Sequence, residues 1–204
     1  GLILTAVGLA VALIRPMAPL KAVPVPQKDE FAQDRAPPKV TQPPFDAARA
    51  MKHLEDICAI GTRVSGSAGM DKQQKVLEKH FTEQGAKVTW QKFEGKQKST
   101  RATTAMANLI ASWHPDRPVR VIICSHYDTR PRADQETDRS KKEQPFLSAN
   151  DGGSGVAFLM ELGQHMKNLK TKVGVDFVFF DGEEYIFEPR RDKFFFGSEH
   201  FARN

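Results

Sequence analysis

Residues 175–184 read VDFVFFDGEE, an apolar and aromatic run that passes directly into a cluster of acidic residues. Residues 119–126, VRVIICSH, repeat the pattern, because a mostly apolar run leads into Ser125 and His126. Short runs of this kind are typical of strands that are buried on both faces of a sheet. In open α/β sheets, sites gather beyond the carboxyl ends of the strands. We therefore expect two buried strands whose polar ends contribute to one site.

Apolar residues at helical spacing surround these two strands. Asp46 is suited to cap a helix, and Gly85 is suited to end one. In the second helix we expect Val76, Leu77 and Phe81 to face the core. The expected helices lie at residues 46–60, 70–84 and 154–168, and further strands lie at residues 86–93 and 106–113. Strands that alternate with helices predict an α/β fold with a mixed or largely parallel sheet.

The first 44 residues differ from the rest of the chain. Residues 1–15 are almost wholly apolar, which is typical of a signal or membrane-anchor segment, although a buried helix has the same composition. Residues 16–44 are rich in proline and polar residues and are expected to form a linker. We expect an exported or membrane-anchored protein. Its catalytic domain, residues 45–204, is expected outside the cytoplasm, with membrane contact only through the N-terminal segment.

Composition excludes some classes of function. The 204 residues include 30 Lys and Arg against 25 Asp and Glu, a net charge of +5 that is spread along the chain. Because no basic stripe is interleaved with aromatic residues, we expect no nucleic-acid partner. The two cysteines, Cys58 and Cys124, form no CxxC pair, which argues against a thiolate zinc site.

Two structural expectations concern Cys124 and the charged segment that follows it. Cys124 lies in an apolar run and is expected to be a small buried side chain. The sequence neither supports nor excludes a disulfide between Cys124 and Cys58. Residues 130–144 are strongly charged and are expected to form an exposed loop.

Three clusters contain the residue types that bind metals. Ser125–Asp128 follows the first apolar strand, residues 149–155 (ANDGGSG) precede a helix, and Asp181–Glu184 follows the second strand. His126, Asp151 and Glu184 form the nitrogen and oxygen ligand set that Zn²⁺ accepts. Asp128 is placed to accept the second ring N–H of His126 and so to orient the ring. Glu183, next to Glu184, is suited to general acid–base work beside a metal.

Each cluster has an ordinary structural explanation when it is taken alone. A His-x-Asp sequence is commonly a surface pair, Asn-Asp-Gly-Gly a turn, and Glu-Glu the solvated start of a helix. Their occurrence together, two of them at the ends of apolar strands, favours a functional site.

Five segments together resemble the superfamily of zinc aminopeptidases and glutaminyl cyclases, from about residue 45 to the end of the chain. They are residues 61–67 (GTRVSGS), 125–128 (SHYD), 148–155 (SANDGGSG), 179–184 (FFDGEE) and 196–201 (FGSEHF). The combination is specific, whereas each segment alone is common. The resemblance implies a three-layer α/β/α sandwich around a mixed, mostly parallel sheet, with the C-terminal part of the domain missing.

The resemblance also implies roles for individual residues. Asp151 and Glu184 are expected to bind zinc, and Glu183 is expected to be the general base or proton shuttle. In two-zinc aminopeptidases the residue that matches His126 is a further ligand, and the residue that matches Asp151 bridges the metals. In animal-type cyclases a single zinc binds and the matching His does not. The expected cofactor is therefore one or two zinc ions, and the expected substrate is a peptide or protein N-terminus.

The segments favour one branch of the superfamily. Residues 150–155 look like the aminopeptidases, whereas the spacer with Asp192 between residues 181–185 and 195–202 looks more like the glutaminyl cyclases. We favour a cyclase, an acyltransferase that converts N-terminal Gln to pyroglutamate and releases ammonia. The alternative enzyme is a zinc aminopeptidase, a hydrolase. A metal-free, inactive receptor-type relative is the alternative of another class, although such relatives usually lose acidic ligands that are intact here.

One departure from the superfamily concerns the ligands. Relatives supply a further His, and two-zinc members a further Asp, from a later part of the domain. This chain has no obvious candidate for either of them, and His200 is not expected to bind zinc. We expect the 204-residue chain alone to bind zinc poorly and to be inactive.

Overall fold

A computed structural model describes residues 45–204 of the chain. The expected signal or anchor segment (residues 1–15) and linker (residues 16–44) lie outside the described residues. In the part of the chain that is described, no helix is both long enough and apolar enough to cross a membrane.

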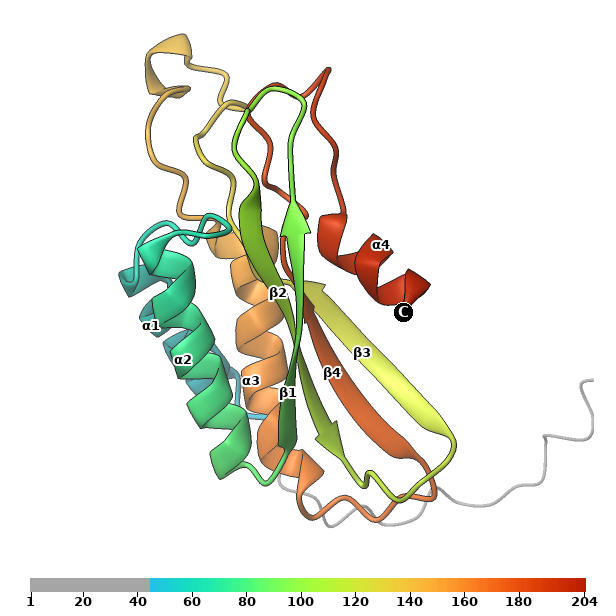
Figure 1. The fold of residues 1–204 in the computed structure, drawn as a ribbon. Helices are drawn as coiled ribbons and strands as arrows, with labels where there is room; N and C mark the ends of the chain where they lie inside the picture. Colours follow the sequence, from blue (N-terminus) through green and yellow to red (C-terminus); the bar gives the residue numbers. More distant parts are fainter. Residues whose placement is uncertain (1–44) are drawn as a thin grey trace, which may run out of the picture. The chain divides into compact units, whose positions relative to one another are not determined.

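Four strands and four α-helices make up the described domain (Figure 1). In chain order they are α1 (Ala47–Ala59), α2 (Ala68–Glu83), β1 (Lys87–Gly95), β2 (Thr104–Trp113), β3 (Arg120–His126), α3 (Ser154–Met166), β4 (Gly174–Phe180) and α4 (Phe196–Arg203). Two short turns of helix, η2 (Arg139–Lys141) and η3 (Ala149–Gly153), lie between β3 and α3. Every helix and strand that the sequence predicts is therefore present, with ends shifted by a few residues.

The four strands form one mixed sheet with the order β1-β2-β4-β3. β3 and β4 are parallel, whereas β2 is antiparallel to both β1 and β4. The α/β class with a mixed sheet is confirmed, but the expectation of a mostly parallel sheet is wrong for these four strands. The reason is that β1 and β2 are joined directly and can only reverse direction, while the parallel pair is connected through the crossover helix α3.

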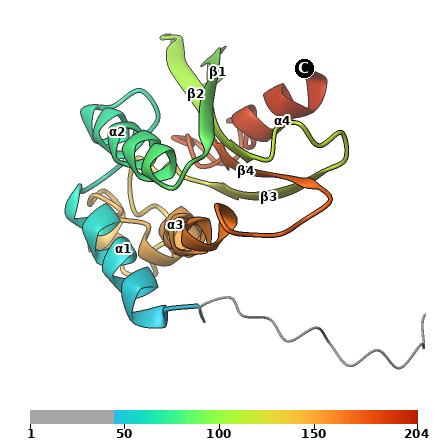
Figure 2. The same ribbon diagram turned by 90° about the horizontal axis from the view of Figure 1, so that it is seen from below.

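Helices cover both faces of the sheet (Figure 2). α1, α2 and α3 lie on one face, and α4 lies on the other, so the expected three layers are present. The main core lies between the sheet and α2 and α3. Its centre is an aromatic cluster of Phe81, Trp113, Phe177 and Phe179, all at most 3% exposed.

Local signals define the ends of the first two helices. The carboxylate of Asp46 accepts the Arg49 amide at 3.0 Å and caps α1. Gly85 has a φ of +79° and ends α2, as expected. Leu77 and Phe81 are fully buried, but Val76 is 40% exposed, so its predicted position in the core is wrong. The buried face of α2 follows the i, i+4 series through Leu77 and Phe81, and Val76 lies one position off it.

β3 is less buried than the sequence predicts. It is an edge strand of the described sheet, and Val121 and Ile122 are 46% and 50% exposed. Cys124 is an exposed free cysteine, not a buried one, and Cys58 is also free. β4 is the strand that lies between two neighbours and is buried along most of its length. An apolar run predicts a strand, but its neighbours in the sheet determine whether it is covered.

Candidate metal and catalytic site

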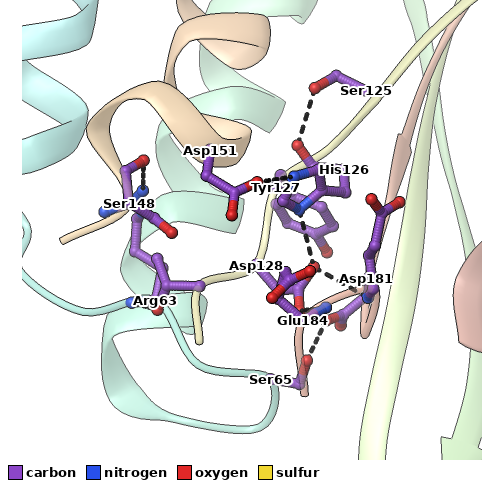
Figure 3. A network of polar contacts seen from close by, with 12 residues as sticks. Arg63, Ser65, Ser125, His126, Tyr127, Asp128, Ser148, Asp151, Asp181 and Glu184 are labelled. Atoms are coloured by element: carbon purple, nitrogen blue, oxygen red, sulfur yellow. Dashed lines mark hydrogen bonds and ion pairs between the residues drawn. The ribbon is translucent and has the colours of Figure 1, made fainter. Parts of the chain in front are cut away.

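The polar ends of β3 and β4 lie side by side because the two strands are parallel. His126 is in register with Phe180, so Tyr127–Asp128 and Asp181–Glu184 leave the sheet at the same edge. Residues of η3, at the start of α3, approach this edge from the helical layer (Figure 3). Three predicted clusters from distant parts of the sequence are thus brought together by the sheet.

His126 is held between two carboxylates. Its Nε2 lies 3.0 Å from Oδ1 of Asp151, and its Nδ1 lies 3.4 Å from Oδ1 of Asp128 (Figure 3). Burial of the ring opposes protonation. Asp128, aided by Glu183 and Asp151, outweighs that effect and raises the pKa of His126 to about 9.

Gly152 allows the close approach of η3 to His126. It has a φ of +82°, and a Cβ at this position would lie 2.9 Å from Cε1 of the ring. A larger residue would therefore be strained by its backbone conformation and would collide with His126. The Asn-Asp-Gly-Gly turn is needed here to bring Asp151 to the imidazole.

Asp128 joins the two strand ends. Its fully buried carboxylate accepts the amide N–H groups of Glu183 at 3.1 Å and of Glu184 at 2.8 Å. The sequence predicts that Asp128 orients His126, and the structure adds this second role. One carboxylate therefore holds the acidic turn of β4 against the end of β3.

Glu183 and Glu184 have different surroundings. Burial raises the pKa of Glu183; His126 acts against this effect, while Asp128 and Asp151 reinforce it. Burial also raises the pKa of Glu184, although the guanidinium of Arg130 lowers it in part. Nε of Arg130 donates to Oε2 of Glu184. A carboxylate with a raised pKa holds a proton more readily than an ordinary Glu, which fits the proton-transfer role predicted for Glu183.

Buried polar residues that the sequence analysis did not single out support the site. Asp181 accepts hydrogen bonds from Oγ of Ser65 at 2.6 Å and from the amide of Ala107 at 2.9 Å. The fully buried Arg63 donates to the carbonyl oxygens of Gly61 and Leu147 at 2.8 and 2.9 Å. Arg63 and Ser65 lie in the GTRVSGS segment, and that segment is the signal that could have identified them.

Arg130 is a further residue that the sequence analysis missed. It lies in the segment 130–144, which was expected to be exposed, yet its side chain is only 10% exposed. The expectation is wrong at this position because Arg130 turns inward to Glu184, while charged neighbours such as Arg139 remain exposed. Composition predicts a loop but does not show which of its charges has a buried partner.

The donor set suits zinc in chemistry, since it offers an imidazole nitrogen and carboxylate oxygens. His126 and Asp151 are in contact, whereas Glu184 pairs with Arg130. Among residues 45–204, no three His, Cys, Asp or Glu side chains lie close enough together to hold a metal ion. The assignment of Asp151, Glu184 and His126 as ligands, and of Glu183 as the base, therefore stays a prediction.

Comparison with known proteins places this arrangement in context. Residues 108–204 match the model of peptidase family M28. The structure is similar to that of Fimbriiglobus ruber glutaminyl cyclase, with 55% identity and a TM-score of 0.78, over 83% of this chain and 58% of that one. It is also similar to a Zn-dependent exopeptidase from Parabacteroides distasonis, with 30% identity and a TM-score of 0.73, over 79% and 57% of the two chains.

A curated relative gives a shorter match. The alkaline phosphatase isozyme conversion protein of Escherichia coli is 30% identical over 79 residues, which is 38% of this chain and 23% of that protein. The chain thus spans less than two thirds of the length of each of these relatives.

Proposed function

We propose that this chain belongs to the superfamily of zinc aminopeptidases and glutaminyl cyclases, and that the full-length protein is a zinc enzyme that acts on peptide N-termini. The observation that carries the proposal is that His126, Glu183 and Glu184 follow the parallel strands β3 and β4 at one edge of the sheet, where Asp151 of η3 contacts His126. Metal-binding and proton-transferring groups are needed together for this chemistry. We assign one or two zinc ions as the cofactor.

Glutaminyl cyclisation is the favoured reaction. It is supported by the 55% identity to Fimbriiglobus ruber glutaminyl cyclase. The substrate would be a peptide with N-terminal Gln. Its α-amine would attack the γ-carboxamide carbon, a new C–N bond would close the ring, and the C–N bond to the amide nitrogen would break to release ammonia.

Each residue of the site has a part in this scheme. Asp151 and Glu184 would hold the metal, which supplies Lewis-acid polarisation of the carboxamide oxygen when it is bound. Glu183 would accept the proton from the attacking amine and deliver it to the departing ammonia. Its raised pKa suits a group that both takes and gives a proton. Asp128 would keep Glu183 in place through the amide hydrogen bond.

Aminopeptidase activity is the second candidate, and the match to peptidase family M28 favours it. The same residues would serve, with water as the nucleophile in place of the substrate's own amine. Glu183 would then take its proton from water. In this scheme His126 would be a further metal ligand beside Asp151 and Glu184.

Two substrates offered side by side to the zinc-loaded full-length protein test the proposal. One is a peptide that begins with Gln, followed by mass spectrometry for loss of ammonia. The other begins with Leu and is followed for release of the free amino acid. Ammonia loss without release of a residue supports the cyclase, and release of leucine supports the aminopeptidase. If neither reaction occurs, the inactive relative becomes the better explanation.

A further inference from the structure

Arg130 occupies a buried position between two carboxylates. Its Nε donates to Oε2 of Glu184, and its Nη1 lies 2.9 Å from each carboxylate oxygen of Asp134. The guanidinium also lies over the ring of Phe194, 5.7 Å from the ring centroid. The side chains of Arg130, Asp134 and Glu184 are only 10–13% exposed. The three contacts together restrain the orientation of the guanidinium.

These contacts connect the candidate site to its surrounding loops. Asp134 belongs to the connection between β3 and α3, and Phe194 belongs to the connection between β4 and α4. Arg130 therefore links the two connections, because it contacts Asp134 in the first and both Glu184 and Phe194 in the second. A guanidinium is suited to this position because its planar fork offers several donors in fixed directions, which the ammonium group of lysine does not.

We propose that Arg130 is a positioning residue that holds the Glu184 carboxylate for metal binding, and that Asp134 holds Arg130. This inference rests on the proposed function, in which Glu184 is a zinc ligand. A hydrogen bond to Oε2 restrains the carboxylate, and Oε1 would remain available as the donor atom for a metal. Carboxylates that bind metals are commonly oriented by hydrogen bonds of this kind, and their loss weakens metal binding.

The charge of Arg130 does not oppose this role. A lone guanidinium next to a metal site would repel the cation. Here Asp134 pairs with the same guanidinium through both oxygens, so the two side chains together carry no net charge. Arg130 therefore acts on Glu184 through an ion pair with a directed hydrogen bond, while Asp134 offsets its charge toward a bound cation.

A charge-conserving double substitution tests the proposal in the full-length protein. Arg130→Gln combined with Asp134→Asn removes the hydrogen bonds and leaves the net charge unchanged. We expect zinc affinity, measured by competition with a chromophoric chelator, to fall by about 10- to 100-fold, as is typical when an orienting partner of a metal ligand is lost. Unchanged or tighter zinc binding would overturn the proposal.

The matched control is a second Arg–carboxylate pair in the same connection. Nη1 of Arg132 lies 2.7 Å from Oε2 of Glu143, and neither residue contacts a candidate ligand. Arg132→Gln with Glu143→Gln also conserves charge and loosens the same loop. We expect this variant to keep the zinc affinity of the wild type. An equal loss in both double variants would mean that general loosening of the loop, not Arg130, weakens binding.

Glu184→Gln separates this inference from the proposed function. If Glu184→Gln leaves zinc affinity unchanged, Glu184 is not a ligand and the premise fails. If it weakens binding, adding the Arg130 and Asp134 substitutions should have no further effect, because Arg130 acts through Glu184. A further loss of zinc affinity as large as the loss that the double substitution causes in the wild type would overturn the role of Arg130, but not the assignment of Glu184 as a ligand. Should the double variant not fold, Arg130→Lys provides the test, with weaker zinc binding expected and unchanged binding contradicting the proposal.

Discussion

Glu183 is the residue on which the proposed chemistry depends most. It lies three residues after the end of β4, its amide is held by Asp128, and burial raises its pKa. The neighbouring Glu184 pairs with Arg130 instead. Two adjacent carboxylates therefore have separate partners, which is what a metal ligand and a proton shuttle require.

Glu183→Gln is expected to abolish most of the activity of the full-length enzyme. Loss of a general acid–base group typically lowers kcat by about 10²- to 10⁴-fold. Zinc affinity should be retained, because Glu183 is not assigned as a ligand. Turnover of the preferred substrate together with a chelator competition assay measures both quantities. Wild-type turnover in the variant would show that the mechanism is wrong.

Asp181 is a buried carboxyl group with a different role. Burial and the nearby Asp128 raise its pKa from 3.8 to about 7, against the hydrogen bond from Ser65. Between these two pH values the folded state retains a proton that the unfolded state releases. The stability that this proton contributes is fully present below pH 3.8 and is lost as pH rises through about 7.

Asp181→Asn should destabilise the domain by about 1–3 kcal/mol, because an NH2 donor replaces one of the two oxygens that accept from the Ser65 hydroxyl and the Ala107 N–H. The penalty should be larger at mildly acidic pH than at mildly alkaline pH, since only the wild type loses stability over that range. Denaturant unfolding of the wild type and the variant, at one mildly acidic and one mildly alkaline pH, measures this penalty. A penalty that grows with pH would contradict the raised pKa.

At the scale of the elements, the connection between β4 and α4 is held by the connection between β1 and β2. The carboxylate of Asp192 accepts the Ser99 amide and hydroxyl at 2.9 and 2.5 Å, and the amides of Phe187 and Glu188 at 2.9 Å each. Gln97 adds hydrogen bonds to the Lys193 backbone. The spacer that suggests the cyclase branch is thus an ordered part of the domain.

Asp192→Asn is expected to loosen residues 185–195. Burial tends to raise the pKa of Asp192, but the hydrogen bonds from Ser99, Glu188 and Phe187 lower it, so the charged form contributes stability above its unfolded pKa. The substitution places an amide N–H against buried donors, at a cost of about 1–3 kcal/mol. Faster hydrogen exchange of amides in this segment is the expected result.

Asp138→Asn is the control for this prediction. Asp138 accepts the amide and hydroxyl of Ser140 in a similar local turn, but at an exposed position on another connection. The Asp138→Asn substitution should leave amide hydrogen exchange at residues 185–195 unchanged. Equal protection in the wild type and the Asp192 variant would show that the hydrogen bonds do not order the segment.

At the scale of the whole molecule, the sheet determines which residues meet. β4 lies between β2 and β3, so the acidic turn after it is flanked by residues from both neighbours. The described residues bring His126 to Asp151 but gather no three metal-binding side chains. The chain also spans 58% of the length of Fimbriiglobus ruber glutaminyl cyclase.

We expect the 204-residue chain, expressed without any further sequence, to bind zinc weakly. Two or three protein ligands give much lower affinity than a complete site, because each ligand adds to the binding free energy. Equilibrium dialysis against buffered zinc measures the dissociation constant. Tight binding that survives a strong chelator would contradict this expectation and would imply that the ligands named here are sufficient.

Much of the fold and the site follows from local patterns in the sequence. Asp46 and Gly85 mark helix ends through their own backbone preferences, and the apolar runs before His126 and Asp181 mark strands. These features depend on residues close together in the chain. The polar clusters after the two apolar strands and before the expected third helix were likewise enough to name Asp151, Glu183 and Glu184 as candidates.

The remaining features depend on contacts between distant segments. Sequence spacing could not show that β3 is an edge strand, that Cys124 is exposed, or that Arg130 turns inward to Glu184. An apolar strand or a charged loop residue has the same local pattern whether it is covered or open. Its environment is set by the pairing of strands and by partners more than 50 positions away, such as Glu184 for Arg130, and only the folded chain brings these together.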